Sequence, residues 1–116
     1  AVVECGSGNL HDRRGCDDGV GFTSVAGRFA ADALGFVDVV GNTSEWTASC
    51  DAIGCGKRLV AGSSWRTERE SAQSMTVSPA QMLAADVGYD DVGLRLLREV
   101  DASSLPALQT RRANQP

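Results

Sequence analysis

Four cysteines in two close pairs constrain the fold of this chain more than any other feature. Ten residues separate Cys5 from Cys16, and four separate Cys50 from Cys55. Four cysteines allow three disulfide connectivities, of which the local one is the simplest. Zinc is the alternative, but ligands of a zinc knuckle usually have about two to four residues between them, and the first pair lies farther apart. The pattern therefore favours disulfides over zinc or free thiols, and with them a secreted or periplasmic location.

Length and composition indicate one small, loop-rich domain. A chain of 116 residues has room for a single core, and thirteen glycines against 5% aromatic residues predict many turns and short elements. The net charge of −4 leaves no basic surface for phosphates, so we expect no nucleic-acid partner. No apolar run approaches the roughly 20 residues that span a bilayer, so a membrane-spanning chain is not expected either.

Local patterns predict short elements separated by loops. Residues 1–21 are interrupted by glycines and are predicted to form a loop that a Cys5–Cys16 bond would order. Residues 44–49 and 57–61 alternate polar and apolar side chains, which predicts two strands with the second cysteine pair between them.

Two helical segments are also predicted, and a third segment is ambiguous. The run FAADAL at residues 29–34 fits one helical turn that stops at Gly35. Ser78-Pro79 has the residue types of a helix start, which predicts a short helix through Ala85. Residues 92–100 fit either a helix face or a strand, and the choice stays open.

Three blocks in fixed order carry a family resemblance. They are GFVDVVGNTSEWT at residues 35–47, RLVAGSSW at residues 58–65 and VGLR at residues 92–95. They resemble the Gly-Asn-x-x-Glu-Trp, Arg-Gly-Gly-Ser-Trp and Gly-Phe-Arg segments of the formylglycine-generating-enzyme, or sulfatase-modifying-factor, family. A weaker upstream match starts at Asp18-Gly19. The resemblance covers about residues 5–97 and corresponds to the C-terminal portion of the family's domain.

The resemblance implies an α+β, C-type-lectin-like sulfatase-modifying-factor fold, with short strands and extensive irregular loops stapled by disulfides. On this basis residues 1–100 are predicted to be the C-terminal portion of such a domain, and residues 101–116 a polar C-terminal tail.

The residues that this family uses for catalysis are replaced. Its oxidases bind copper through two cysteines just after the Gly-Gly-Ser strand, and those positions fall here at Arg66 and Ser71. Neither side chain is a copper(I) ligand. Another branch uses a histidine cluster for iron, whereas this chain has His11 alone. We therefore expect neither copper nor iron, and the sequence leans against an enzyme without deciding the question.

Calcium is the metal that the resemblance favours, because tight glycine turns with carboxylates and carbonyls supply the oxygen ligands that it requires. A carboxylate at Glu45 beside Trp46 also calls for a cation or donors nearby if the tryptophan is buried. The first implied site comprises Asp38, Gly41, Thr43 and Glu45. The second comprises Asn9, Leu10, Asp18 and Val20. The alternative is that Asp38 and Glu45 only cap turns.

The sequence thus predicts a non-catalytic structural or binding module of this family, a subunit or fragment of a larger extracytoplasmic assembly. Its expected partner is a polypeptide that supplies the N-terminal half of the domain, or another subunit. The alternative is part of a metal-dependent oxidase whose active residues lie on a missing N-terminal portion. Copper or iron would favour the oxidase, and calcium alone the binding module.

Overall fold

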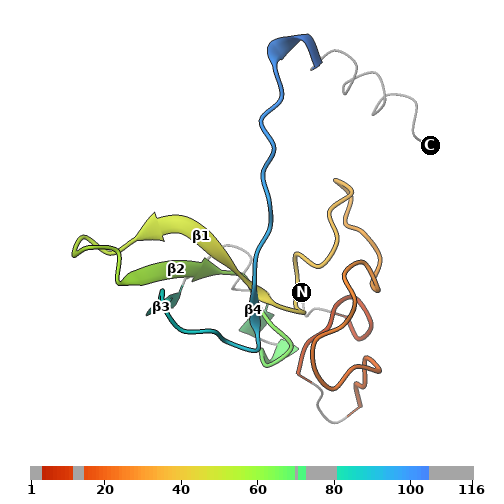
Figure 1. Ribbon diagram of the computed structural model, residues 1–116. Helices are drawn as coiled ribbons and strands as arrows, with labels where there is room; N and C mark the ends of the chain where they lie inside the picture. Colours follow the sequence, from red (N-terminus) through yellow and green to blue (C-terminus); the bar gives the residue numbers. More distant parts are fainter. Residues whose placement is uncertain (1–3, 12–14, 70, 73–80, 105–116) are drawn as a thin grey trace.

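A computed structural model describes residues 4–11, 15–69, 71–72 and 81–104. Their centre is a four-stranded sheet of order β3-β2-β1-β4 (Figure 1). The elements in chain order are β1 (Ser44–Cys50), β2 (Lys57–Ala61), β3 (Gln81–Ala84), β4 (Val92–Gly93) and the 3-10 helix η1 (Ala102–Ser104). Residues 69 and 71–72 are also helical. The described part is therefore strand-rich, with little helix and long irregular segments.

The two strands predicted from the alternating pattern are present as β1 and β2, and they form an antiparallel hairpin. Trp46 lies opposite Val60, and Cys50 lies opposite Arg58, with a shift of register between these pairs. Such an irregularity bends the strand and increases its twist. The Cys50–Cys55 disulfide closes the connection between the strands. The predicted local pairing is confirmed here and at Cys5–Cys16.

The helix predicted from Ser78 to Ala85 is wrong over its described part. Gln81–Ala84 is strand β3, which pairs antiparallel with β2 from Lys57 to Val60. Residues 78–80 lie outside the described residues. The Ser-Pro start is a purely local signal, whereas the edge of β2 satisfies the backbone groups of β3 through contacts distant in sequence.

The helical turn predicted at residues 29–34 is also wrong. The Asp32 carboxylate accepts hydrogen bonds from the backbone N–H of Leu34 at 2.8 Å and of Phe36 at 3.0 Å. Its carbonyl accepts from the N–H of Gly35 at 3.0 Å. An aspartate that binds the backbone ahead of it competes with helical hydrogen bonding, so a turn forms instead.

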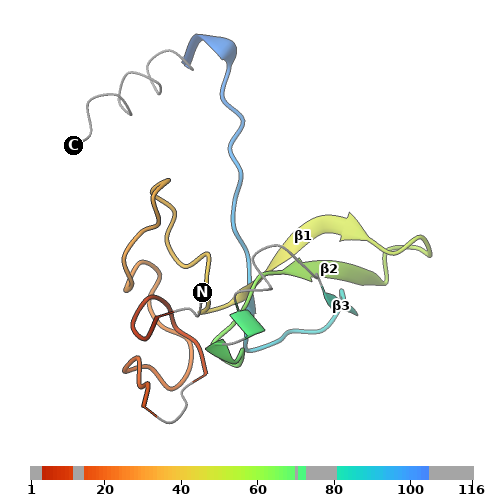
Figure 2. The same cartoon turned by 180° about the vertical axis from the view of Figure 1, so that it is seen from behind.

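The N-terminal loops lie at one end of the sheet, and the tip of the β1–β2 hairpin projects at the other end (Figures 1 and 2). Among the described residues the buried hydrophobic side chains are Leu10, Val60 and Ala72. They come from the N-terminal loop, the sheet and the helical segment after it. The core therefore lies where these three parts meet, and it is small.

The ambiguous segment 92–100 begins as a strand. β4 pairs parallel with β1, Val92 opposite Ser44 and Gly93 opposite Glu45. Beyond Gly93 the chain leaves the sheet and runs away from the body of the molecule to η1 (Figure 2). Of the predicted tail, residues 105–116 lie outside the described residues.

Candidate functional site

The Gly41-Asn42 turn joins the N-terminal loop to the start of the sheet. Gly41 has φ +83°, and a Cβ there would collide with the backbone of Asn9, so only glycine fits. Asn42 has φ +62°, which asparagine tolerates better than most residues. Its Oδ1 accepts hydrogen bonds from Asn9 Nδ2 at 3.1 Å and from the N–H of Ser24 at 2.8 Å. The Gly-Asn pair of the motif is thus a structural junction.

Three residues of the first predicted calcium site line one cavity of about 140 Å³: Asp38, Thr43 and Glu45. Gly41 lies in the same turn but does not line the cavity. Asp38 Oδ2 accepts a hydrogen bond from the N–H of Gly27 at 2.7 Å. Asp38 Oδ1 is buried and has no hydrogen-bond partner among the described residues. An unpaired buried carboxylate oxygen is unfavourable, and a cation or donor would satisfy it.

Arg95 also lines this cavity and binds Glu45 through two nitrogens. Its Nη2 and Nε lie 2.6 Å and 3.0 Å from Glu45 Oε1, and Nη2 also donates to the carbonyl of Val37 at 3.0 Å. The hydrogen bond with Glu45 raises the pKa of Arg95 above its usual value, against a smaller opposing effect of burial. The charged partner of Glu45 is therefore a guanidinium, where the sequence had pointed to a metal.

Sequence reasoning assigned Arg95 only to the closing Gly-Leu-Arg block and gave it no role. The arginine and its partner are 50 positions apart, and only the parallel pairing of β4 with β1 brings them together. The one available signal was the need of Glu45 for a cation or donors, and the resemblance assigned that role to calcium.

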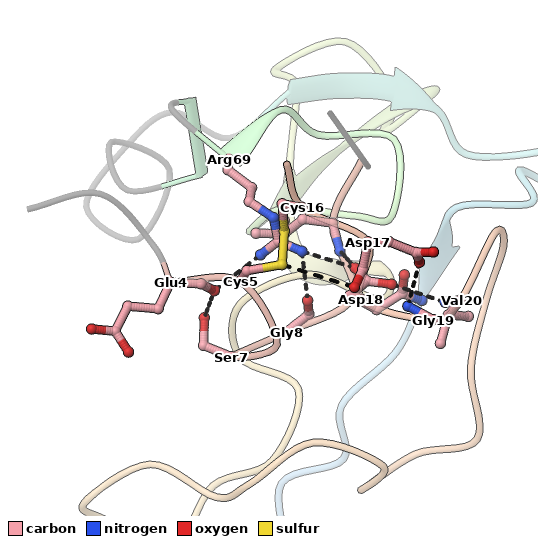
Figure 3. A network of polar contacts seen from close by, with 12 residues as sticks. Glu4, Cys5, Ser7, Gly8, Cys16, Asp17, Asp18, Gly19, Val20 and Arg69 are labelled. Atoms are coloured by element: carbon pink, nitrogen blue, oxygen red, sulfur yellow. Dashed lines mark hydrogen bonds and ion pairs between the residues drawn. A yellow bond between two sulfur atoms is a disulfide. The ribbon is translucent and has the colours of Figure 1, made fainter. Parts of the chain in front are cut away.

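Two members of the second predicted set, Leu10 and Val20, bind Asp18, and Figure 3 shows Asp18 beside Val20. The Asp18 carboxylate accepts hydrogen bonds from the N–H of Leu10 at 2.8 Å and of Val20 at 3.0 Å. Its Oδ2 also forms an ion pair at 3.0 Å with Nη2 of Arg69, whose side chain is 6% exposed while that of Asp18 is 0% exposed. Nearby Asn9 Oδ1 is buried without a hydrogen-bond partner among the described residues. Hydrogen-bond donors therefore surround the Asp18 carboxylate, at the place where calcium was predicted to bind.

Arg69 holds the N-terminal loop together, a role that sequence reasoning missed. It donates to the carbonyls of Glu4 at 3.1 Å and Gly8 at 3.5 Å in addition to Asp18. These acceptors belong to the loop stapled by Cys5–Cys16, which Figure 3 shows beside the guanidinium. Arg69 lies in a run of charged residues, and the neighbouring sequence did not indicate that its side chain would be buried.

Arg66 and Ser71 are the two positions that the resemblance aligns with copper-binding cysteines. The guanidinium of Arg66 lies 4.2 Å from the centroid of the Trp65 ring and pairs with Asp90 at 2.6 Å. Ser71 lies in the helical segment, where its N–H donates to the carbonyl of Glu68 at 2.9 Å. All four cysteines of the chain are in disulfides.

No group of three or more His, Cys, Asp or Glu side chains within the described ranges could hold a metal ion. His11 is exposed, and its backbone forms an isolated bridge with Glu68.

A family model described as the sulfatase-modifying factor enzyme 1-like domain matches residues 3–100. The chain belongs to this family. The predicted resemblance is thereby confirmed, and the matched range includes the Gly41-Asn42 junction, both predicted calcium sets and the segment up to Val100. A search of curated proteins found no match. Within the described residues, no helix is long and apolar enough to cross a membrane.

Proposed function

We propose that this chain is a non-catalytic structural or binding module with the C-type-lectin-like fold of its family, and that it works within a larger extracytoplasmic assembly. The observation that carries the proposal is the replacement of the family's copper-binding thiols by Arg66 and Ser71. Copper(I) selects soft thiolates, and a guanidinium repels the ion by its charge.

The surroundings of Arg66 support a packing role at this position. Its guanidinium stacks on Trp65 and pairs with Asp90, and Trp65 Nε1 donates to the Asp90 carbonyl at 3.4 Å. Phe22 meets the same indole edge-to-face, with 5.3 Å between ring centroids. The cation–π and aromatic contacts stabilise this surface.

Calcium at the first predicted site is part of the proposal. The cavity beside Asp38, Thr43 and Glu45 presents hard oxygen atoms, and Asp38 Oδ1 lacks a donor among the described residues. These groups fit the cation's preference for oxygen ligands. Arg95 would have to release Glu45 when calcium binds. The second site fits less well, because Arg69 and two backbone donors already bind Asp18.

A polypeptide partner follows from the small core. Among the described residues only three hydrophobic side chains are buried, whereas twelve large ones are exposed. Exposed apolar side chains in such number are typical of a surface that another chain covers. The two disulfides support a secreted or periplasmic site of action.

Elemental analysis of the purified protein tests the proposal. A catalytic oxidase requires stoichiometric copper or iron, whereas the binding module requires neither. We expect substoichiometric copper and iron, with calcium retained. One equivalent of copper or iron per chain would favour the oxidase and overturn the proposal.

A further inference from the structure

Residues 94–100, here called the arm, follow β4 and run away from the body of the molecule (Figures 1 and 2). Leu96 and Leu97 are 87% and 90% exposed. Leu94 and Val100 are also exposed. The family match continues through residue 100, so the arm is part of the matched domain. A run of exposed leucines inside a domain is typical of a contact surface.

A mainly apolar groove of about 460 Å³ lies near the base of the arm. Its apolar lining comes from Ala30, Ala31, Phe36, Val39 and Val40. Arg95, at the base of the arm, donates to the carbonyl of Val37, which directly follows Phe36. Phe36 is half exposed in this groove, so its ring also lacks a cover.

The groove is lined by acidic side chains, whereas the arm carries a basic residue, Arg98, beside its leucines and an acidic one, Glu99, after it. Asp32 lines the groove, and two backbone N–H groups hold its carboxylate in place. Asp38 lines the groove as well. On the arm, Arg98 directly follows the two leucines and is exposed. An arginine beside a fixed carboxylate forms a charge-assisted contact.

The arm is held away from the groove of its own chain. β4 pairs with β1 up to Gly93, and Arg95 is then fixed by Glu45 and the Val37 carbonyl. These contacts direct the following residues away from the body, as both views show (Figures 1 and 2). These contacts do not prevent the arm from reaching the groove of another molecule.

We propose that the partner of this module is a second copy of the same chain. Each copy places Leu96 in the groove of the other and Arg98, which an extended chain directs to the same side as Leu96, beside Asp32. The inference rests on the proposed function, because it names the partner of the proposed binding module. One chain carries both halves of the contact, which is the condition for a two-fold symmetric dimer. An extended chain advances only about 7 Å from Arg95 to Leu97. A two-fold axis near the base of the two arms therefore allows each arm to reach the groove of the other chain at the same time.

Sedimentation equilibrium of the oxidised 116-residue chain tests this dimer. We expect wild type to have twice the 12.1 kDa mass of one chain. The double variant Leu96→Asp, Leu97→Asp should have the mass of one chain. Ile53→Asp is the matched control, since Ile53 is 86% exposed but lies in the β1–β2 loop. It should remain a dimer.

A charge exchange tests the register of the contact and leaves the leucines of the arm unchanged. Arg98→Glu places two carboxylates together and should raise the dimer Kd by about tenfold or more. Ala31→Lys adds a cation next to Asp32 in the groove, so the combined variant should recover most of the lost affinity. Circular dichroism of each variant, matched to wild type, checks that folding is retained.

Wild type at the mass of one chain, or an arm variant that stays dimeric, would overturn the inference. Loss of affinity in Arg98→Glu without recovery in the combined variant would overturn the placement of Arg98 beside Asp32. The proposed function is tested separately by metal content. A chain without copper or iron that binds a different polypeptide would overturn only the dimer.

Discussion

At the scale of single residues, the Arg69–Asp18 pair decides whether the N-terminal loop is ordered. Both side chains are nearly buried, and the arginine also binds two loop carbonyls. A buried pair adds little stability compared with an apolar replacement of both partners, but removal of one partner leaves a buried charge alone. The pair therefore affects the stability of the fold most when only one partner is removed.

Arg69→Met should destabilise the fold by about 3–5 kcal/mol, because Asp18 loses its counter-charge inside the protein. The control is Arg66→Met, whose side chain is 53% exposed and whose ion pair should contribute about 1 kcal/mol or less. Urea unfolding followed by tryptophan fluorescence gives both differences. Equal losses in the two variants would contradict the assignment of Arg69 as the buried support of the loop.

Calcium and Arg95 should compete for Glu45. Calcium that binds only the native state raises the melting temperature by mass action. We expect Glu45→Gln to remove most of that increase and Arg95→Gln to enlarge it, because the second change removes the competing cation. The measurement is the melting temperature with calcium and with chelator. A curve that chelator leaves unchanged in wild type and in Arg95→Gln would mean that Asp38 and Glu45 only cap turns.

The surroundings of Glu45 show which contacts of single residues could be predicted from the sequence. The Glu45-Trp46 neighbours were enough to predict a cation near the carboxylate. They could not identify Arg95, since that contact depends on a strand pairing 50 positions away in the sequence. Asp38, Thr43 and Glu45 were named by resemblance and do share a cavity, whereas Asp18 was assigned to calcium and is bound to Arg69.

At the scale of elements, strands with an alternating pattern were predictable and elements decided by long-range pairing were not. The bounds of β1 and β2 agree with the predicted strands to within one residue. β3 was predicted as helix because Ser78-Pro79 resembles a helix start, but pairing with β2 overrides that local preference. The turn at Asp32 was missed because side-chain hydrogen bonds to the backbone are weakly encoded in a short apolar run.

One disulfide lies in the N-terminal loop, and the other closes the connection between β1 and β2. Titration of thiols in the unfolded, unreduced protein should therefore detect no reactive cysteine. After reduction, the same assay should detect all four. Four reactive thiols before reduction would contradict both bonds and remove the main argument for an extracytoplasmic location.

At the scale of the whole molecule, exposed apolar surface outweighs the core. The arm and the tip of the β1–β2 hairpin both project from the body of the molecule (Figure 1). A shape of this kind has little apolar burial to offset the conformational entropy lost on folding.

We therefore predict that stable folding of this chain depends on association. The three buried hydrophobic side chains lie where loop, sheet and helical segment meet, while the arm and the groove stay uncovered in one copy. Hydrogen exchange of β1 and β2 amides should then slow as protein concentration rises, because association protects the native state by mass action. Analytical ultracentrifugation on the same samples shows whether protection follows the associated fraction. If protection required a different added polypeptide, the module would still need a partner, but not a second copy of itself. A monodisperse monomer with slow exchange at every concentration would show that these residues fold alone, and that the exposed leucines of the arm serve no contact that stability requires.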